Sequence, residues 1–244
     1  MTSLTYDDQK GILNIEGIQL TKAEVVEFIT SYDEEKRAPF YQMARKLITN
    51  SLEMEGYLLL LSTWNFASFR YAINQFDIDR FSESMRKFED AVEPISKESF
   101  ASCDLKAVAP YVEKGYNALQ EYKVDNNGKP QPVIGATGAP KLMHLKYPNM
   151  FVLWDGYIRG NKPAYYYNSV DDILKATNWK AMHYGDTGKG YIKFLEDTRD
   201  YFDSVISSYK DDGKPVTKAI DEFNYVAITK PLQEYEKEKK KRNE

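Results

Sequence analysis

Residues 38–50 read APFYQMARKLITN, a pattern that is typical of an α-helix and that recurs along the chain. Its apolar side chains follow one another at three- and four-residue steps: Phe40, Met43, Ala44, Leu47 and Ile48. This spacing gathers them on one face of an α-helix, and Pro39 fits the first turn of that helix. The stretch therefore predicts a helix over residues 38–50.

Helical patterns continue along most of the chain. Residues 52–73 are apolar on all sides, which predicts a central, buried helix. Asp77 or Asp79 is expected to cap a following helix, and Asp104 to cap another. Further helices are expected from residue 169, over residues 190–208 and over residues 215–241. Together these elements predict an all-α fold, a multi-helix globular array.

The N-terminal residues differ from this pattern. Two short apolar runs between residues 11 and 20 are bracketed by glycine, which predicts a small β-hairpin or an extended arm. A capping box, Thr21-Lys-Ala-Glu24, then marks the start of a helix. We therefore expect an arm over residues 1–20 and a single helical domain over residues 21–244. The polar stretch 123–132 is interpreted as a loop, and in a second interpretation it divides the domain into two lobes.

Composition excludes several classes of function. The single cysteine, Cys103, cannot form an internal disulfide or a cysteine-based metal cluster, and there are only two histidines. No metal site and no cofactor are expected. No run approaches the roughly 20 apolar residues needed to cross a bilayer, and the N-terminus does not resemble a signal peptide, so a cytoplasmic protein without membrane contact is expected. The net charge of −4 argues against a generally cationic surface. The oligomeric state stays open.

Residues 133–159 read VIGATGAPKLMHLKYPNMFVLWDGYIR and differ from the rest of the chain. A turn containing Gly135 and Gly138 opens a helix with Lys141 near its N-terminus, and Pro148 ends that helix. An apolar run over residues 150–154 follows, and Asp155 comes directly after it. These residues form the candidate functional segment.

This order resembles the core of the helix-hairpin-helix DNA glycosylases, the superfamily of endonuclease III and 8-oxoguanine glycosylase. In that family a glycine-rich hairpin leads into a helix with a lysine, and an apolar stretch then ends in an aspartate. The resemblance covers 27 residues and matches Lys141 to the lysine and Asp155 to the catalytic aspartate. It implies a DNA-binding repair enzyme, a hydrolase that cleaves the N-glycosidic bond of a flipped base.

The resemblance also implies roles for individual residues. Asp155 would stabilise positive charge on the sugar, and Lys141 would attack C1′ if it acts as a nucleophile. Contacts with nucleic acid would come from the glycine turn and from neighbouring basic and aromatic side chains: Gly135, Thr137, Gly138, Lys146, Trp154, Tyr157 and Arg159. DNA is thus the expected partner.

The residues themselves leave other interpretations open, both for single side chains and for the function of the chain. Asp155 is followed by Gly156 and can cap the next helix, Lys141 can be a surface lysine, and His144 can be a packed histidine. The G-x-x-G spacing, and the position of Lys141 only 14 residues before Asp155, favour a non-catalytic helical module that binds nucleic acid or protein. An enzyme acting on a small nucleotide or nucleoside is the third interpretation.

Overall fold

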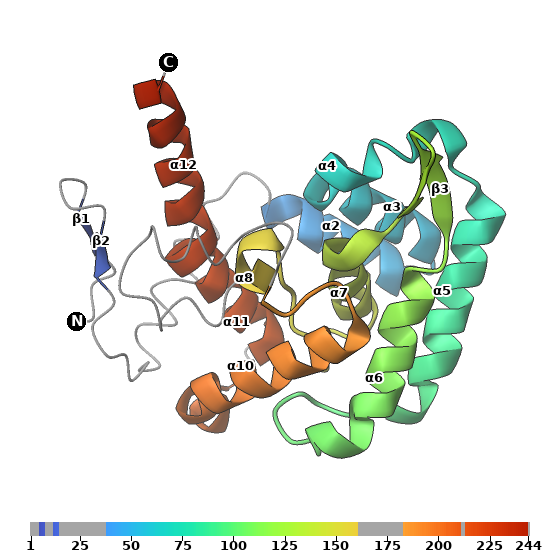
Figure 1. Cartoon of the computed structure of the whole chain (residues 1–244). Coiled ribbons are helices and arrows are strands. Elements are labelled where there is room, and N and C mark those ends of the chain that lie inside the picture. Colours follow the sequence, from blue (N-terminus) through green and yellow to red (C-terminus); the bar gives the residue numbers. More distant parts are fainter. Residues whose placement is uncertain (1–4, 8–11, 15–37, 161–182, 211–212, 244) are drawn as a thin grey trace. The chain divides into compact units, whose positions relative to one another are not determined.

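The computed structural model describes residues 5–7, 12–14, 38–160, 183–210 and 213–243, and helices dominate them (Figure 1). The predicted all-α fold is confirmed. An N-terminal β-hairpin is also present, but its first strand lies before the predicted region: β1 (Thr5–Asp7) pairs antiparallel with β2 (Ile12–Asn14), which is the first of the two apolar runs, and the second run lies outside the described residues. The helices predicted from Thr21 and from Ser169 begin outside the described residues.

The chain divides into two compact units, which we describe separately. Unit 1 contains residues 1–34, 154–185 and 193–244, and unit 2 contains residues 35–153 and 186–192. One of the boundaries falls after Leu153, inside the candidate functional segment. Residues 123–132, considered above as a divide between two lobes, lie within unit 2.

Unit 2 is built from pairs of packed helices. Helix α2 (Ala38–Thr49) packs on α3 (Glu53–Trp64), and α5 (Ile78–Val92) packs on α6 (Leu105–Leu119). Short elements connect them: α4 (Phe66–Phe69) and the 3₁₀ turns η1 (Ile73–Gln75) and η2 (Glu93–Ile95).

Two predicted caps in unit 2 are confirmed. The carboxylate of Asp77 accepts hydrogen bonds from the amides of Asp79 and Arg80 at the start of α5. Asp104 does the same for Lys106 and Ala107 at the start of α6. Each aspartate thereby satisfies amides that have no partner within the helix, which fixes where the helix begins.

The prediction of one long central helix over residues 52–73 is wrong. The segment forms two helices, α3 and α4. It breaks at Asn65, between α3 and α4, and several of its apolar side chains are exposed, including Phe66 and Ile73. Asn65 is buried, and its amide donates to Ile134 O and accepts from the Thr137 hydroxyl. These long-range hydrogen bonds fix Asn65 at the break, and the helical periodicity of the sequence does not reveal them.

The loop predicted over residues 123–132 is also wrong, because these residues form a second β-hairpin. Strand β3 (Lys123–Asn126) pairs antiparallel with β4 (Lys129–Pro132). The connecting residues Asn127 and Gly128 both have positive φ, 55° and 77°, as a type I′ turn requires. The Asn-Gly pair is therefore a hairpin turn.

The central buried helix of unit 2 is α7 (Gly135–Lys146), in which every residue from Gly138 to Leu145 is buried. It contacts α2, α3 and α6. The predicted end before Pro148 is confirmed, since α7 ends at Lys146. The candidate segment thus begins with the helix that forms the centre of unit 2.

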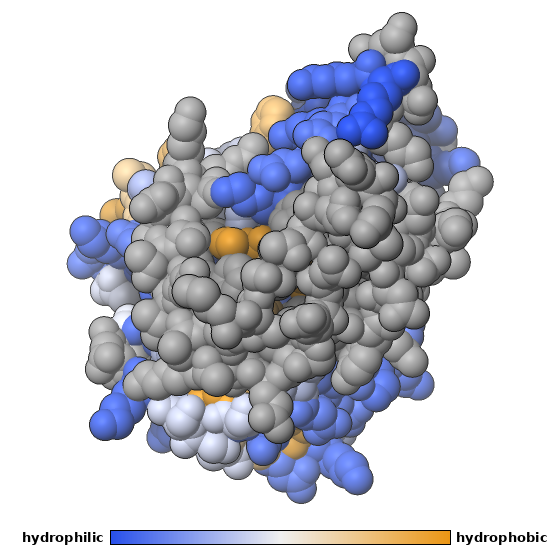
Figure 2. All heavy atoms as spheres, turned by 90° about the vertical axis from the view of Figure 1, so that its left-hand side faces the viewer, coloured by the Kyte–Doolittle hydropathy of each residue, from blue (hydrophilic) through white to orange (hydrophobic). Residues whose placement is uncertain are grey.

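Unit 1 contains α8 (Gly156–Gly160), most of α10 (Gly188–Ser208), α11 (Val216–Asn224) and α12 (Lys230–Asn243). The single helix predicted over residues 215–241 is interrupted by a π-helical segment, η4 (Tyr225–Thr229). The described part of α12 is strongly hydrophilic and includes exposed Lys240, Lys241 and Arg242 (Figure 2). No helix in the described ranges is long and apolar enough to cross a membrane.

Candidate functional site

The start of α7 uses its glycines for backbone geometry and close packing. Gly135 has φ of +68°, a left-handed conformation that favours glycine. Gly138 lies one turn into the helix, where an added Cβ would be 2.8 Å from Asn65 Nδ2 and 3.0 Å from Ile134 Cγ2. Thr137 donates its hydroxyl hydrogen to Asn65 Oδ1. The G-x-x-G motif therefore packs α7 against the break between α3 and α4.

Lys141 lies inside unit 2, with only 8% of its surface exposed. Its Nζ donates to the carbonyl oxygen of Trp64 over 2.7 Å. Trp64 is the last residue of α3, where the helix dipole places partial negative charge. A lysine amine in this position stabilises the C-terminus of α3.

His144 is fully buried one turn after Lys141, as expected for a packed histidine. Its Nδ1 lies 2.6 Å from Phe151 O, and its Nε2 lies 2.7 Å from the hydroxyl of Tyr41. Because a carbonyl oxygen can only accept, Nδ1 donates, and in the neutral ring Nε2 accepts from Tyr41. His144 thus ties α7 to α2 and to the apolar run that follows α7.

Lys146, at the end of α7, bridges two carboxylates of unit 2. Its Nζ is 2.9 Å from Glu53 Oε1 and 3.3 Å from Glu89 Oε1. Burial lowers the pKa of Lys146, but its two glutamates outweigh that effect and leave the pKa raised. Glu89 also accepts from the buried hydroxyl of Tyr57, whose pKa is raised chiefly by burial.

Asp155, in unit 1, forms the N-cap of α8, as one of the alternatives above expects. Its Oδ1 accepts from the amides of Tyr157 and Ile158, over 2.8 and 3.0 Å. Its Oδ2 accepts from the hydroxyl of Thr229 in η4 over 2.6 Å. Lys141 belongs to unit 2 and Asp155 to unit 1, so the surroundings of each residue are described within its own unit.

The remaining predicted contact residues of unit 1 surround this cap. Trp154 is buried, and its ring packs on those of Tyr184 and Phe194. Tyr157 donates to Glu236 Oε2 over 2.6 Å, and burial, followed by this hydrogen bond, raises its pKa. Arg159 is 9% exposed. The assignment of these residues to nucleic acid contacts is untested by such internal contacts and stays a prediction.

A buried charged cluster in α11 was not found from the sequence. Lys218 is 2% exposed and lies 2.6 Å from Asp221 and 3.3 Å from Glu222, which also binds Lys214 over 2.8 Å. Burial raises the pKa of Glu222, and the two lysines oppose that rise. The spacing of Lys218 and Glu222, at i and i+4, was the available signal. Because every charge in the cluster is paired with its neighbours, we interpret it as part of the unit's interior.

The protein is all-α, and polar side chains of the candidate segment make hydrogen bonds and ion pairs with other residues of their own unit. Among the described residues, no group of three or more His, Cys, Asp or Glu side chains is placed to hold a metal ion. No protein-family model, no curated protein and no solved structure matches the chain. Function must therefore be argued from the residues.

Proposed function

We propose that this chain is a non-catalytic helical module that binds nucleic acid. The nucleic acid partner is what the resemblance to helix-hairpin-helix proteins implies. The observation that carries the non-catalytic part of the proposal is the position of Lys141, which is buried in unit 2 with its Nζ hydrogen-bonded to Trp64 O. A lysine that attacks C1′ must present an amine lone pair to the substrate. A buried amine that donates to a helix C-terminus is poorly placed for that reaction.

The other polar groups of α7 support the same proposal. Thr137 and His144 make hydrogen bonds within unit 2, and Lys146 is paired with Glu53 and Glu89. Groups that already serve the fold can be redirected to a substrate only at the expense of stability. The resemblance to helix-hairpin-helix proteins then concerns architecture and the class of partner.

A hydrolase that uses Asp155 is the second candidate, and one observation favours it. Two backbone amides and the Thr229 hydroxyl hold the Asp155 carboxylate in a fixed orientation. Amide donors at a helix N-terminus favour the ionised form of a carboxylate. Such a group can stabilise positive charge that develops on a sugar while water attacks C1′ and the base leaves.

One experiment separates the two candidates. The parent protein is incubated with labelled single- and double-stranded oligonucleotides, undamaged and damaged, and both binding and base release are measured. The proposal expects binding without release, and no product trapped by borohydride. Base release that is lost in Asp155→Asn would establish the hydrolase instead. If the parent binds no oligonucleotide, the proposed function is wrong.

A further inference from the structure

Outside the candidate segment, exposed aromatic and cationic side chains of unit 2 follow one another from α4 through η1 to the start of α5, and η1 and α5 are hydrogen-bonded to the β3–β4 hairpin (Figure 1). We call this region the basic–aromatic surface and define it by six side chains: Phe66, Arg70, Tyr71, Ile73, Arg80 and Lys123. We propose that it binds single-stranded nucleic acid, with bases stacked on Tyr71 and Phe66 and phosphates held by Arg70, Arg80 and Lys123. This inference rests on the proposed function and assigns it a site.

The hairpin is held firmly against the helical part of the surface. The side-chain amide of Gln75 donates to Asp125 O over 2.7 Å and accepts from Asp125 N over 3.2 Å. It thereby satisfies both backbone groups of Asp125 in β3, as a further strand would. The Tyr122 hydroxyl accepts from Asp77 N and donates to Gln75 O. The hairpin, η1 and the start of α5 are therefore held together before a ligand binds, which lowers the entropic cost of binding to this part of the surface.

Apolar exposure is concentrated in the helical part of the surface. Phe66, Tyr71 and Ile73 are each about half exposed, at 50%, 50% and 49%. The guanidinium of Arg70 lies 4.8 Å from the centre of the Tyr71 ring and donates to its hydroxyl. An exposed aromatic ring beside a guanidinium plane is a suitable platform for an unpaired base, because both groups stack on flat π systems.

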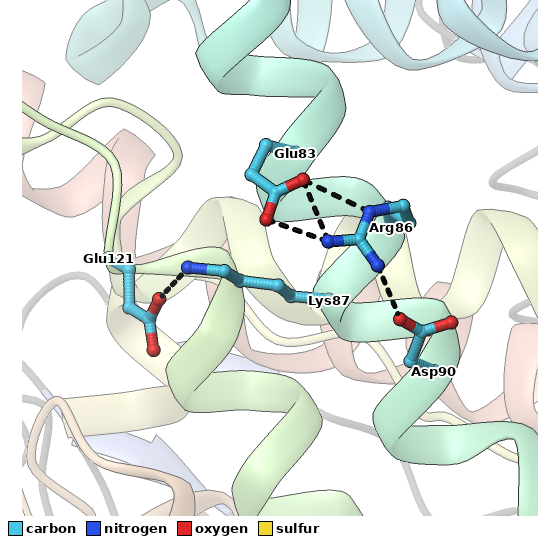
Figure 3. A network of polar contacts seen from close by, with 5 residues as sticks. All are labelled: Glu83, Arg86, Lys87, Asp90 and Glu121. Atoms are coloured by element: carbon cyan, nitrogen blue, oxygen red, sulfur yellow. Dashed lines mark hydrogen bonds and ion pairs between the residues drawn. The ribbon is translucent and has the colours of Figure 1, made fainter.

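The cations of this surface differ from those further along α5. There, Arg86 is paired with Glu83 and Asp90, and Lys87 with Glu121 (Figure 3). Arg70, Arg80 and Lys123 make no ion pair with any residue that the structure describes; Arg80 lies over the Tyr122 ring and donates to Lys123 O. Cations without carboxylate partners remain available to neutralise phosphates.

Nearby carboxylates do not cancel this charge through direct contact. Asp77 is occupied by the amides of Asp79 and Arg80, and Asp125 accepts from Gly128 N in the hairpin turn. Asp79 remains as an exposed acid in the first turn of α5. Arg70 beside the exposed Tyr71 ring, with Arg80 and Lys123 on the adjoining elements, matches a single strand, which offers phosphates and unstacked bases together. A duplex hides the faces of its bases, so it is the poorer match.

The test measures the affinity of the full chain for a fluorescent oligothymidylate of about 12 nucleotides, a typical site size for such platforms. Tyr71→Ala is compared with Tyr111→Ala, which removes an exposed tyrosine from α6. We expect Tyr71→Ala to weaken binding about tenfold, Tyr111→Ala to leave it unchanged, and Tyr71→Trp, which keeps a stacking ring, to retain it.

The charge arm of the test compares two double variants of equal charge change. Arg80→Gln with Lys123→Gln should weaken binding at least about tenfold, whereas Arg86→Gln with Lys87→Gln should change it less than about threefold. Thermal unfolding curves confirm that each variant is folded. If the parent binds and both arms match their controls, the inference is overturned while the proposed function stands. If the parent binds no single strand but does bind a duplex, the inference alone is again overturned; if it binds neither, both fall.

Discussion

Helix α7 and the basic–aromatic surface belong to the same unit but use similar side chains differently. In α7, Thr137, Lys141 and His144 are hydrogen-bonded to other parts of unit 2, and Lys141 and His144 are buried. On the surface, Arg70 and Tyr71 are exposed, and the Arg70 guanidinium lies over the Tyr71 ring and donates to its hydroxyl. Residue types that often act in catalysis, such as lysine and histidine, therefore stabilise the fold in α7, whereas the side chains exposed to a ligand lie on the basic–aromatic surface.

The largest expected effect is on the packing of α7. Gly138→Ala should lower the free energy of unfolding by about 2–3 kcal/mol, because the new methyl group would overlap Asn65 and Ile134. Gly135→Ala is the matched control: nothing lies within 4 Å of its added Cβ, and only the positive φ opposes it, so about 1 kcal/mol is expected. Urea denaturation measures both, and equal losses would contradict the role assigned to Gly138.

Removing the buried amine should have the next largest effect. Lys141→Met keeps most of the side-chain volume but loses the hydrogen bond to Trp64 O, which should cost about 2 kcal/mol of stability. Lys123→Met, on the exposed hairpin, should change stability by less than about 0.5 kcal/mol. The same denaturation experiment distinguishes them. If Lys141→Met were as stable as the parent, the structural role of this lysine would be refuted.

A smaller effect is expected at Asp155. Asp155→Ala removes the acceptor for two amides of α8 and should cost about 1 kcal/mol, whereas Asp155→Asn keeps an amide oxygen in the cap and should cost less. Thermal unfolding of the two variants gives the order. Because the Ala variant loses the Thr229 contact as well, an Asn variant less stable than the Ala variant would contradict the capping role assigned to this side chain.

The smallest effect concerns the salt dependence of oligonucleotide binding. Each phosphate neutralised on a single strand contributes about 0.7 to the slope of log K against log salt concentration. The variant with Arg80→Gln and Lys123→Gln should therefore show a slope smaller in magnitude by about 1.4. The variant with Arg86→Gln and Lys87→Gln should keep the slope of the parent. If the slope fell equally in both double variants, the strand would be attracted by the overall charge of the protein and not by this surface.

Much of the fold could be predicted from the sequence because its signals are local. The caps at Asp77 and Asp104 and the end of α7 before Pro148 depend on neighbouring residues alone. The break at Asn65 could not be predicted, because its partners Ile134 and Thr137 lie far along the chain. The β3–β4 hairpin was missed although Asn127-Gly128 carries its turn signal, since prolines in β4 suggested a loop.

The candidate site was less predictable for the same reason. The sequence indicates a lysine near a helix start and an aspartate after an apolar run. The aspartate follows its apolar run as predicted, but α7 begins at Gly135, so Lys141 lies in the middle of the helix. The sequence cannot indicate that Lys141 turns inward to Trp64 O, or that Gln75 and Tyr122 fix the hairpin beside Arg80. Exposure and ion pairing arise from tertiary contacts, and these decide which charges a ligand can reach.

Photocrosslinking can locate a bound single strand on the chain. A single-stranded oligonucleotide carrying 5-iodouracil, which crosslinks to aromatic rings stacked on it, is bound to the full chain, irradiated and mapped by peptide mass spectrometry. If the basic–aromatic surface is the binding site, crosslinks are expected within residues 66–80, centred on Tyr71. Crosslinks confined to residues 135–159 would place the ligand on the candidate segment and contradict that assignment.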